Sequence, residues 1–356
     1  MNSPIKIIFN PCENKENQYI DILVNALEKH GFEVSPLDDF LTSVAHFQSI
    51  KLLHLNWFEN LDDGSANSMW KSYIRKLVVL AAIKFGKKKL VWTMHNRLSH
   101  EKKSGKLSRA LTRKIVAQVD AVVIHASITK DILRNQYPNL QAKIVHIPHP
   151  DFIDVYGPML PESSVESNSP LKLLFLGAIK PYKNIELLIE IAQQFPTDIH
   201  LTIAGNPNSE SYQGELQHLA SEASNMTLEL KFIPDQDLPS YIHHSDLLIL
   251  PYSLESSLNS GTVILAFSYG RTVICPRIGT IDDLDAGENV FDYTYASEAE
   301  HREALEKQIH RAISLKRNNP ESLREKGLSM REMVQKKNDK VQVSSQLIEL
   351  YKNLLE

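Results

Sequence analysis

The sequence predicts an α/β protein built from two doubly wound domains in tandem, and three observations support this. The chain has 356 residues, which is too many for one hydrophobic core. Short apolar runs alternate with segments of helical periodicity in units of roughly 30 residues, a pattern typical of parallel sheets covered by helices on both faces. The alternation stops in a stretch rich in Pro, Ser and Glu at 157–170 and then begins again.

The first domain is expected over residues 1–157. Its first strand is IKIIF at 5–9, and the helix that follows places apolar residues from Ile20 to Leu27 on one face and ends near Gly31. Further strands are expected at 52–56, 89–94, 120–125 and 144–147.

The second domain is expected over residues 170–335, after a linker at 158–169. A helix is expected at 183–195, and 318–356 is helical in periodicity, with 336–356 expected to pack back on the N-terminal domain. Strands are expected at 171–177, 199–205, 227–232, 246–252 and 272–275.

Composition excludes several classes of protein. The chain is 42% hydrophobic and 23% charged, so it is neither disordered nor fibrous. Its two cysteines, Cys12 and Cys275, form no disulfide framework or metal-ligand pattern. No signal peptide and no apolar run of membrane-spanning length is visible, so a cytoplasmic location is expected.

Charge is unevenly distributed along the chain. The formal net charge is −4, yet residues 71–114 contain 14 basic residues and one acidic residue, Glu101. This segment is a candidate for contact with an anionic membrane surface, with residues 87–89 and 102–103 as its exposed points. A basic face that is merely solvated is the alternative.

Two segments of the second domain are candidates for phosphate binding. Lys180 and Lys183 stand between a strand that ends at Gly177 and the next helix, where lysines and free backbone N–H groups attract anions. Residues 260–262, Ser-Gly-Thr, begin a helix that is apolar all round and therefore buried, which leaves its N-terminus suited to an anion. The alternatives are surface lysines in an ordinary turn and a simple serine N-cap.

Polar residues also follow the strands of the first domain. His95 and Asn96 come directly after a strand, and with Glu101 they are capable of acid–base chemistry. Trp57 and Glu59 follow another strand and suit the stacking and hydrogen bonding of a sugar. Structural roles for these residues are the alternative.

The loop at 10–19 begins at Asn10 and lies where an acceptor or phosphate would enter. The dinucleotide fingerprint, the P-loop and the Gly-x-Ser-x-Gly motif are absent, which argues against an NAD enzyme, a P-loop NTPase and a serine hydrolase.

Together these segments resemble a GT-B fold glycosyltransferase. The segments FLGAIKPYKNIELLIE, LTIAG and SGTVILAFSYGRTVIC resemble the C-terminal domain of family 4 and its neighbours. The steps Trp57-Phe58-Glu59 and Trp92-Thr93-x-His95-Asn96 resemble the N-terminal domain of a bacterial branch that builds exopolysaccharide, capsule or O-antigen units on lipid carriers.

The resemblance implies a role for each domain, with the two facing a cleft. The C-terminal domain would bind a UDP- or GDP-linked sugar, and the N-terminal domain would bind a glycan or polyprenyl-diphosphate-linked acceptor. His95 would be catalytic, together with Glu101. The donor phosphates would contact Gly177, Lys180, Lys183, Ser260, Gly261 and Thr262. The nucleoside or sugar would contact Asn259, Glu255 and Pro234. The acceptor would contact Asn10, Trp57, Glu59 and Asn96.

The sequence departs from the family pattern at two places. Ser257 and Leu265 stand where family 4 has a pair of glutamates, and Gly177 is followed by Ala178 rather than Arg. Glu255 is a candidate to replace a lost hydroxyl contact.

The resulting expectation is a metal-independent hexosyltransferase of surface polysaccharide biosynthesis that needs no cofactor and binds no nucleic acid. It would lie in the cytoplasm or peripherally on the inner face of the membrane. A nucleotide-sugar 2-epimerase of the same fold and a non-catalytic two-lobed binding protein are the alternatives.

Overall fold

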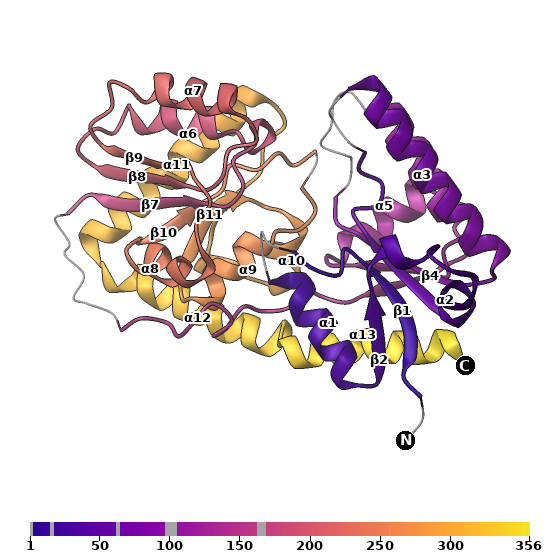
Figure 1. The fold of residues 1–356 in the computed structure, drawn as a ribbon. Coiled ribbons are helices and arrows are strands. Elements are labelled where there is room, and N and C mark those ends of the chain that lie inside the picture. Colours follow the sequence, from indigo (N-terminus) through magenta and orange to yellow (C-terminus); the bar gives the residue numbers. More distant parts are fainter. Residues whose placement is uncertain (1–2, 15–17, 62–64, 97–104, 162–168, 256) are drawn as a thin grey trace. The chain divides into compact units, whose positions relative to one another are not determined.

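The computed structural model describes residues 3–14, 18–61, 65–96, 105–161, 169–255 and 257–356 (Figure 1). Contacts divide the chain into two compact units. Unit 1 contains residues 1–150 and 340–356, and unit 2 contains residues 151–339. Residues 151–156 belong to unit 2 because the backbone N–H groups of Phe152 and Tyr156 donate to the hydroxyl groups of Ser268 and Tyr269, at 2.9 and 3.0 Å.

Unit 1 is a parallel six-stranded sheet in the order β2-β1-β3-β4-β5-β6. Figure 1 shows α1 and α13 together on one side of this sheet and α3 on the other. The strands are β1 (Ile5–Asn10), β2 (Phe32–Ser35), β3 (Leu52–Asn56), β4 (Lys89–Met94), β5 (Ala121–Ile124) and β6 (Lys143–His146). The helices are α1 (Tyr19–Lys29), η1 (Leu37–Asp39), α2 (Val44–Ser49), α3 (Ala66–Phe85), α4 (Gly105–Val116), α5 (Ile128–Gln136) and α13 (Lys340–Leu355).

Unit 2 is a second parallel six-stranded sheet, in the order β12-β11-β10-β7-β8-β9. Helices α6, α7 and α11 cover one side of it, and α9 and α12 pack on the other (Figure 1). The strands are β7 (Leu171–Leu176), β8 (Ile199–Ala204), β9 (Met226–Glu229), β10 (Leu247–Ile249), β11 (Thr272–Pro276) and β12 (Phe291–Tyr293). The helices are η2 (Pro181–Lys183), α6 (Ile185–Ala192), α7 (Glu210–Leu219), η3 (Asp235–Asp237), α8 (Leu238–His243), α9 (Gly261–Ser268), α10 (Gly279–Leu284), η4 (Gly287–Asn289), α11 (Glu298–Asn318) and α12 (Glu321–Lys337).

The predicted fold class of two doubly wound domains is confirmed. The predicted strands at 52–56 and 89–94 match β3 and β4 residue for residue, because their apolar runs are buried on both faces of a parallel sheet. The short strands β2 and β12 were not predicted. The helical periodicity of 318–356 is confirmed and belongs to two helices: α12 and α13 are separated at Asn338, whose carbonyl accepts the Asp151 N–H (2.7 Å).

Each sheet has a point where the strand order reverses, and ligands of open α/β sheets bind at the carboxyl ends of the strands there. In unit 1 this switch point lies between β1 and β3, which end at Asn10 and Asn56. In unit 2 it lies between β7 and β10, which end at Leu176 and Ile249. The residues that follow these four strands are therefore candidates for a functional site.

Candidate active site

The switch point of unit 2 brings together residues that are far apart in the sequence. Gly177 follows β7 with φ 126°, a left-handed conformation that favours glycine. A side-chain carbon on Gly177 would lie 3.6 Å from both Lys183 Nζ and Thr262 Oγ1. An ammonium group and a hydroxyl group thus converge on a residue without a side chain, an arrangement that suits phosphate binding.

The N-terminus of α9 is held in place by its own cap. Ser260 Oγ accepts the N–H of Val263 (3.2 Å) and hydrogen-bonds the hydroxyl of Tyr252 (2.9 Å). Because Val263 to Ser268 are all buried, packing fixes the helix, while its first amides, those of Gly261 and Thr262, project from the helix end. The predicted buried helix and its start are confirmed.

The loops after β7 and β10 are tied to each other. Asn184, in a left-handed conformation with φ 54°, donates from Nδ2 to the carbonyl of Pro251 (2.8 Å). Lys180 is half-buried at the start of η2. The residues predicted to contact the nucleoside or sugar lie in unit 2: Glu255 is exposed, and Asn259 and Pro234 are half-buried. Their roles stay predictions.

In unit 1, His95 and Trp57 form a stacked pair. Their ring centroids are 4.0 Å apart and their planes differ by 17°. Trp57 has φ 49°, a conformation that bulky residues rarely adopt and that is found mostly where function requires it. The structure therefore places two of the predicted site residues in direct contact at the end of β3 and β4.

Hydrogen bonds define the tautomer of His95. Asn56 donates from Nδ2 to the carbonyl oxygen of Asn10 (3.3 Å), so its Oδ1 faces His95 Nε2 at 3.0 Å as an acceptor. Nε2 must then carry the proton, and Nδ1 carries the lone pair. Burial, with His125 and two further histidines nearby, holds the pKa of His95 well below its usual value. The imidazole is neutral near pH 7.

A chain of hydrogen bonds runs through the sheet beside His95. His125 Nδ1 donates to the carbonyl of Ile147 (2.8 Å), so its Nε2 accepts the Tyr19 hydroxyl (2.9 Å). Tyr19 in turn accepts from Thr93, whose Oγ1 then accepts His54 Nε2–H (2.6 Å).

At the other end of this chain, His54 Nδ1 accepts the hydroxyl of Tyr351 on α13. Since a carbonyl oxygen only accepts, the Ile147 end fixes the direction of every bond. The chain also fixes the tautomers of His54 and His125. These assignments require neutral rings, and burial lowers the pKa of both histidines to about 3.

The remaining predicted residues of unit 1 differ in their surroundings. The carboxylate of Glu59 is buried and accepts the indole N–H of Trp92 (3.1 Å). Asn96 is half-buried directly after His95. Glu101, the second predicted catalytic residue, lies outside the described residues, as do the lysines at 102–103. The roles of Glu59, Asn96 and Glu101 stay predictions.

Sequence reasoning missed three residues of this cluster. Tyr19, at the first position of α1, contacts His95 edge to face, with ring centroids 5.5 Å apart. His125 and His149 continue the row of rings. The ring centroids of His95 and His125 are 5.2 Å apart, and those of His125 and His149 are 5.7 Å apart. His125 directly follows β5, just as His95 directly follows β4. The pattern of a polar residue after a strand, which indicated His95, therefore also indicates His125. Tyr19 carried no such signal.

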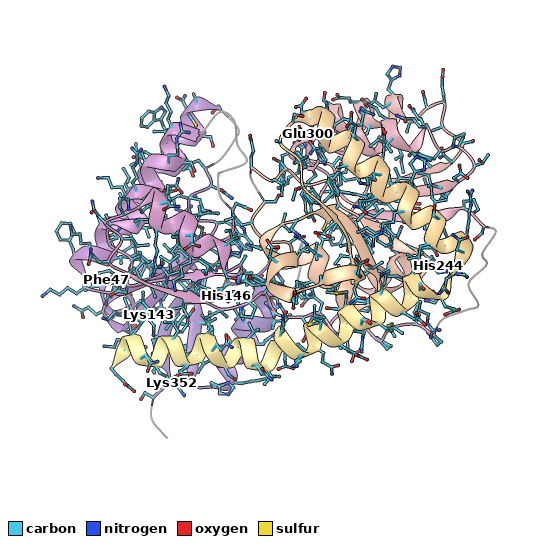
Figure 2. The ribbon with its side chains drawn as sticks, turned by 180° about the vertical axis from the view of Figure 1, so that it is seen from behind. Phe47, Lys143, His146, His244, Glu300 and Lys352 are labelled. Atoms are coloured by element: carbon cyan, nitrogen blue, oxygen red, sulfur yellow. The ribbon has the colours of Figure 1, made fainter. Side chains whose placement is uncertain are left out.

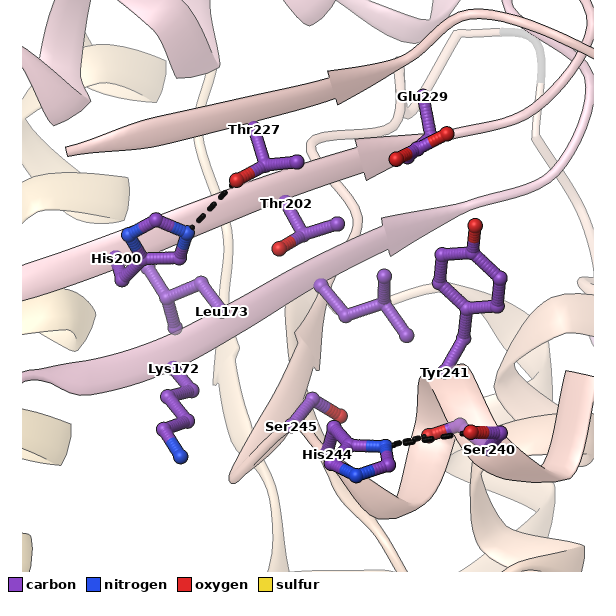
Figure 3. Close-up of a pocket in the computed structure, with 11 residues that line it drawn as sticks. Lys172, Leu173, His200, Thr202, Thr227, Glu229, Ser240, Tyr241, His244 and Ser245 are labelled. Carbon is purple, nitrogen blue, oxygen red and sulfur yellow. Dashed lines mark hydrogen bonds between the residues drawn. The ribbon is translucent and has the colours of Figure 1, made fainter. Parts of the chain in front are cut away.

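Unit 2 has a further cavity, of about 320 Å³, on the face of β7, β8 and β9 (Figure 3). Within it, His200 bonds Thr227 (3.0 Å), and the side chains of Glu229 and Tyr241 lie on the same side. None of the predicted site residues lines it. Among the described residues no cluster of three or more His, Cys, Asp or Glu side chains suits a metal ion.

Comparison with known proteins identifies the class. Residues 160–330 match the family model described as glycosyl transferases group 1. The chain is 27% identical over 228 residues to a GDP-mannose:glycolipid 4-beta-D-mannosyltransferase of Xanthomonas campestris pv. campestris, an alignment that covers 63% of this chain and 61% of that protein. It is 24% identical over 265 residues to the alpha-maltose-1-phosphate synthase of Mycolicibacterium smegmatis, which covers 70% and 67% of the two chains.

Solved structures show the same fold over nearly the whole chain. Anabaena Alr3699/HepE, in complex with UDP and glucose, superposes with a TM-score of 0.69 at 16% identity, covering 98% of this chain and 100% of that one. A glycosyltransferase from Rickettsia africae gives a TM-score of 0.67 at 15% identity, covering 100% of both chains.

The chain thus has the GT-B fold, and its residues 160–330 are similar to the group 1 glycosyl transferases. The resemblance expected from the sequence is confirmed. The chain spans about 61% of the length of the mannosyltransferase it matches.

Proposed function

We propose that this protein is a glycosyltransferase that moves a hexosyl group from a nucleotide-diphospho-sugar to a glycan or lipid-linked saccharide in surface polysaccharide biosynthesis. The observation that carries this proposal is the convergence of Lys183 Nζ and Thr262 Oγ1 on Gly177 at the end of β7. The similarity to a glycolipid mannosyltransferase supports a lipid-linked acceptor.

In the proposed reaction, the bond between the anomeric carbon and the diphosphate oxygen breaks, and the electron pair leaves with the diphosphate. Lys183 and the amides of Gly261 and Thr262 stabilise the charge that develops there. Preorganised donors of this kind are worth several kcal/mol in other enzymes. No step assigned to these residues calls for a metal ion.

His95 has a role that depends on the stereochemical outcome. If the reaction inverts the anomeric centre, the lone pair on Nδ1 takes the proton of the acceptor hydroxyl as the new bond forms. If the configuration is retained, His95 orients the donor sugar instead. NMR of the product's anomeric proton distinguishes the two.

A thermal-shift panel of UDP, GDP, ADP and CMP tests the proposal first. A nucleotide at 100 times its Kd stabilises the protein by about 2.7 kcal/mol, so the correct base will raise the unfolding temperature. Transfer is then measured with the matching sugar nucleotides and a lipid-linked saccharide. If no nucleotide raises the unfolding temperature, the proposal is wrong.

The panel also separates the alternatives. An epimerase would convert the sugar nucleotide without any acceptor, which NMR of a two-component incubation would show. A binding protein would show the thermal shift without turnover.

The proposal places the protein in the cytoplasm, peripherally on the membrane. None of the helices in the described ranges is long and apolar enough to cross a bilayer. The basic segment 71–114 supports contact with an anionic surface.

A further inference from the structure

Helix α3 carries an apolar stripe on its exposed side. Trp70, Ile74, Val78 and Phe85 are 51%, 56%, 51% and 86% exposed. Their spacing of four, four and seven residues places them on one face of the helix. The helix already packs on its unit through Val79, Leu80 and Ile83, so the described residues of unit 1 leave the stripe exposed. A contiguous exposed apolar strip of this kind marks an interaction surface.

The neighbouring flank of the same helix lines a polar cavity. This cavity has a volume of about 370 Å³, within the range of small-molecule sites. Lys71, Arg75 and Lys76 line it from α3, and Asn10 lines it from the end of β1. Since β1 ends at the switch point of unit 1, the cavity lies where this fold binds ligands.

The described residues that line the cavity carry a net positive charge. Among them Asp38 is the only acidic residue, and it pairs with Arg75. Lys76 donates to the carbonyl of Asn60 and lies 5.1 Å from the centre of the Phe58 ring. Three cations against one carboxylate suit an anion with more than one charge.

The stripe indicates where that anion comes from. Helix α3 has no acidic residue, and its apolar face lies beside Lys71 and Lys84, the composition of a helix that lies in the surface of an anionic bilayer. The lysines at 87–89, expected from the sequence to be the membrane contacts, are partly engaged within unit 1: Lys88 donates to the carbonyl of Ile50 (2.9 Å), and Lys89 pairs with Asp120 (3.6 Å).

We propose that the cavity lined by Asn10, Lys71, Arg75 and Lys76 binds the diphosphate of a lipid, while the apolar stripe of α3 lies in the bilayer surface that holds this lipid. The proposal rests on the proposed function only for the view that the lipid is the acceptor. The ligand class is a membrane-bound diphosphate.

Vesicle flotation tests the cavity. Neutral phosphatidylcholine vesicles are prepared with polyprenyl diphosphate, or with phosphatidylserine at equal total charge. The variant K71Q/R75Q is compared with K130Q/K143Q, which removes the same charge from exposed sites on α5 and on β6, where Figure 2 labels Lys143. The Arg75–Asp38 pair is largely exposed, so its loss costs little stability.

The wild-type protein is expected to prefer the diphosphate vesicles. K71Q/R75Q should lose roughly 10- to 30-fold of that affinity, since each cation near a membrane surface contributes severalfold. K130Q/K143Q should stay within about twofold of the wild type, because its lysines lie outside the cavity. Equal losses in the two variants would show general electrostatic attraction and overturn the proposal.

Two further variants test the apolar stripe and the donor site separately for their contributions to vesicle binding. W70S/I74S/F85S should lose binding to every vesicle by more than about 100-fold, because three large apolar side chains leave the bilayer. In a K180A/K183A background, which lacks the lysines of the predicted donor site, it should keep the affinity for inorganic pyrophosphate. Unchanged vesicle binding would overturn the bilayer contact, and soluble pyrophosphate binding as tight as the vesicle-borne lipid would overturn the lipid source.

K180A/K183A removes the two lysines of the predicted donor site and should bind diphosphate vesicles like the wild type. If this variant alone loses binding, the diphosphate belongs to unit 2 and the cavity proposal fails, while the proposed transfer reaction stands. If transfer is never detected but the flotation pattern holds, the cavity proposal stands without the reaction.

Discussion

The imidazole of His95 lies stacked on the indole of Trp57, with the two ring planes only 17° apart. Tyr19 meets both rings edge to face, at centroid distances of 5.5 Å to His95 and 6.1 Å to Trp57. His95 is therefore held by a ring on its face, a ring at its edge and a hydrogen bond from its Nε2, which leaves it little freedom to move.

Replacing Trp57 tests the importance of this support. W57A should lower kcat for transfer by roughly 10- to 100-fold, because small displacements of a reacting group have effects of this size. W57F keeps a flat ring under His95 and should lose less than W57A. Nucleotide binding, followed by thermal shift, should not change in either variant. Equal kcat for W57A and the wild type would show that the stack has no catalytic role.

Lys183 is expected to stabilise the leaving diphosphate. K183A should lower kcat by roughly two to three orders of magnitude, the loss typical of one preorganised charge-stabilising group. K172A is the matched control, since Lys172 is an exposed lysine of the same strand region that lines the separate cavity on the face of the sheet. Near wild-type kinetics of K183A would reject the assignment.

Acid should destabilise unit 1 through its buried histidines. Burial lowers the pKa of His149 to about 4, against an ordinary value of 6.5. Below pH 6.5 His149 becomes protonated in the unfolded chain but stays neutral in the folded protein. Stability that is present at pH 7 is therefore lost as the pH falls toward 4. For this one residue the loss between pH 7 and pH 5 is about 2 kcal/mol.

Urea unfolding at the two pH values measures the effect. All three tryptophans, Trp57, Trp70 and Trp92, lie in unit 1, so their fluorescence reports on this unit. H149Q should show a smaller loss of stability between pH 7 and pH 5 than the wild type. The same loss in both proteins would mean that His149 is not held neutral.

Gly205 should tolerate no side chain. It follows β8 with φ 151°, and an added carbon would lie 1.9 Å from the carbonyl oxygen of Gly177. G205A should therefore destabilise the protein by about 1–3 kcal/mol, as overpacking does, and weaken nucleotide binding by displacing Gly177. G214A, in α7 with open space around it, should be neutral or stabilising. Thermal unfolding compares the two, and similar values would contradict the close approach.

Tyr351 is expected to fasten α13 to the sheet. Its hydroxyl is the donor to His54 Nδ1, at the start of the chain of hydrogen bonds that ends at Ile147. Y351F leaves a buried acceptor without that donor, which should cost about 1–3 kcal/mol. Y73F serves as the control, because Tyr73 is half-buried on α3 and lies outside this chain of hydrogen bonds. A stability loss no larger than that of Y73F would refute the hydrogen bond between Tyr351 and His54.

Much of the fold was predictable because parallel strands bury both faces and therefore appear as continuous apolar runs. The candidate site was predictable only in part. Polar residues directly after strands, such as His95 and Gly177, are visible in the sequence because the strand before them is. Tyr19 opens a helix, and His54 lies inside a strand among apolar neighbours, where a histidine has no distinguishing pattern.

The sequence by itself determined the two doubly wound sheets, the start of α9 and the lysines after β7, because these follow from local periodicity and from the residue types that begin and end helices. Only the tertiary structure decided which of these residues meet. Strand order brings β7 beside β10 and β1 beside β3, although each pair is separated by at least 40 residues of chain. Lys183 and Thr262 both lie beside Gly177, and Tyr351 reaches His54, because packing joins chain segments that no local pattern connects.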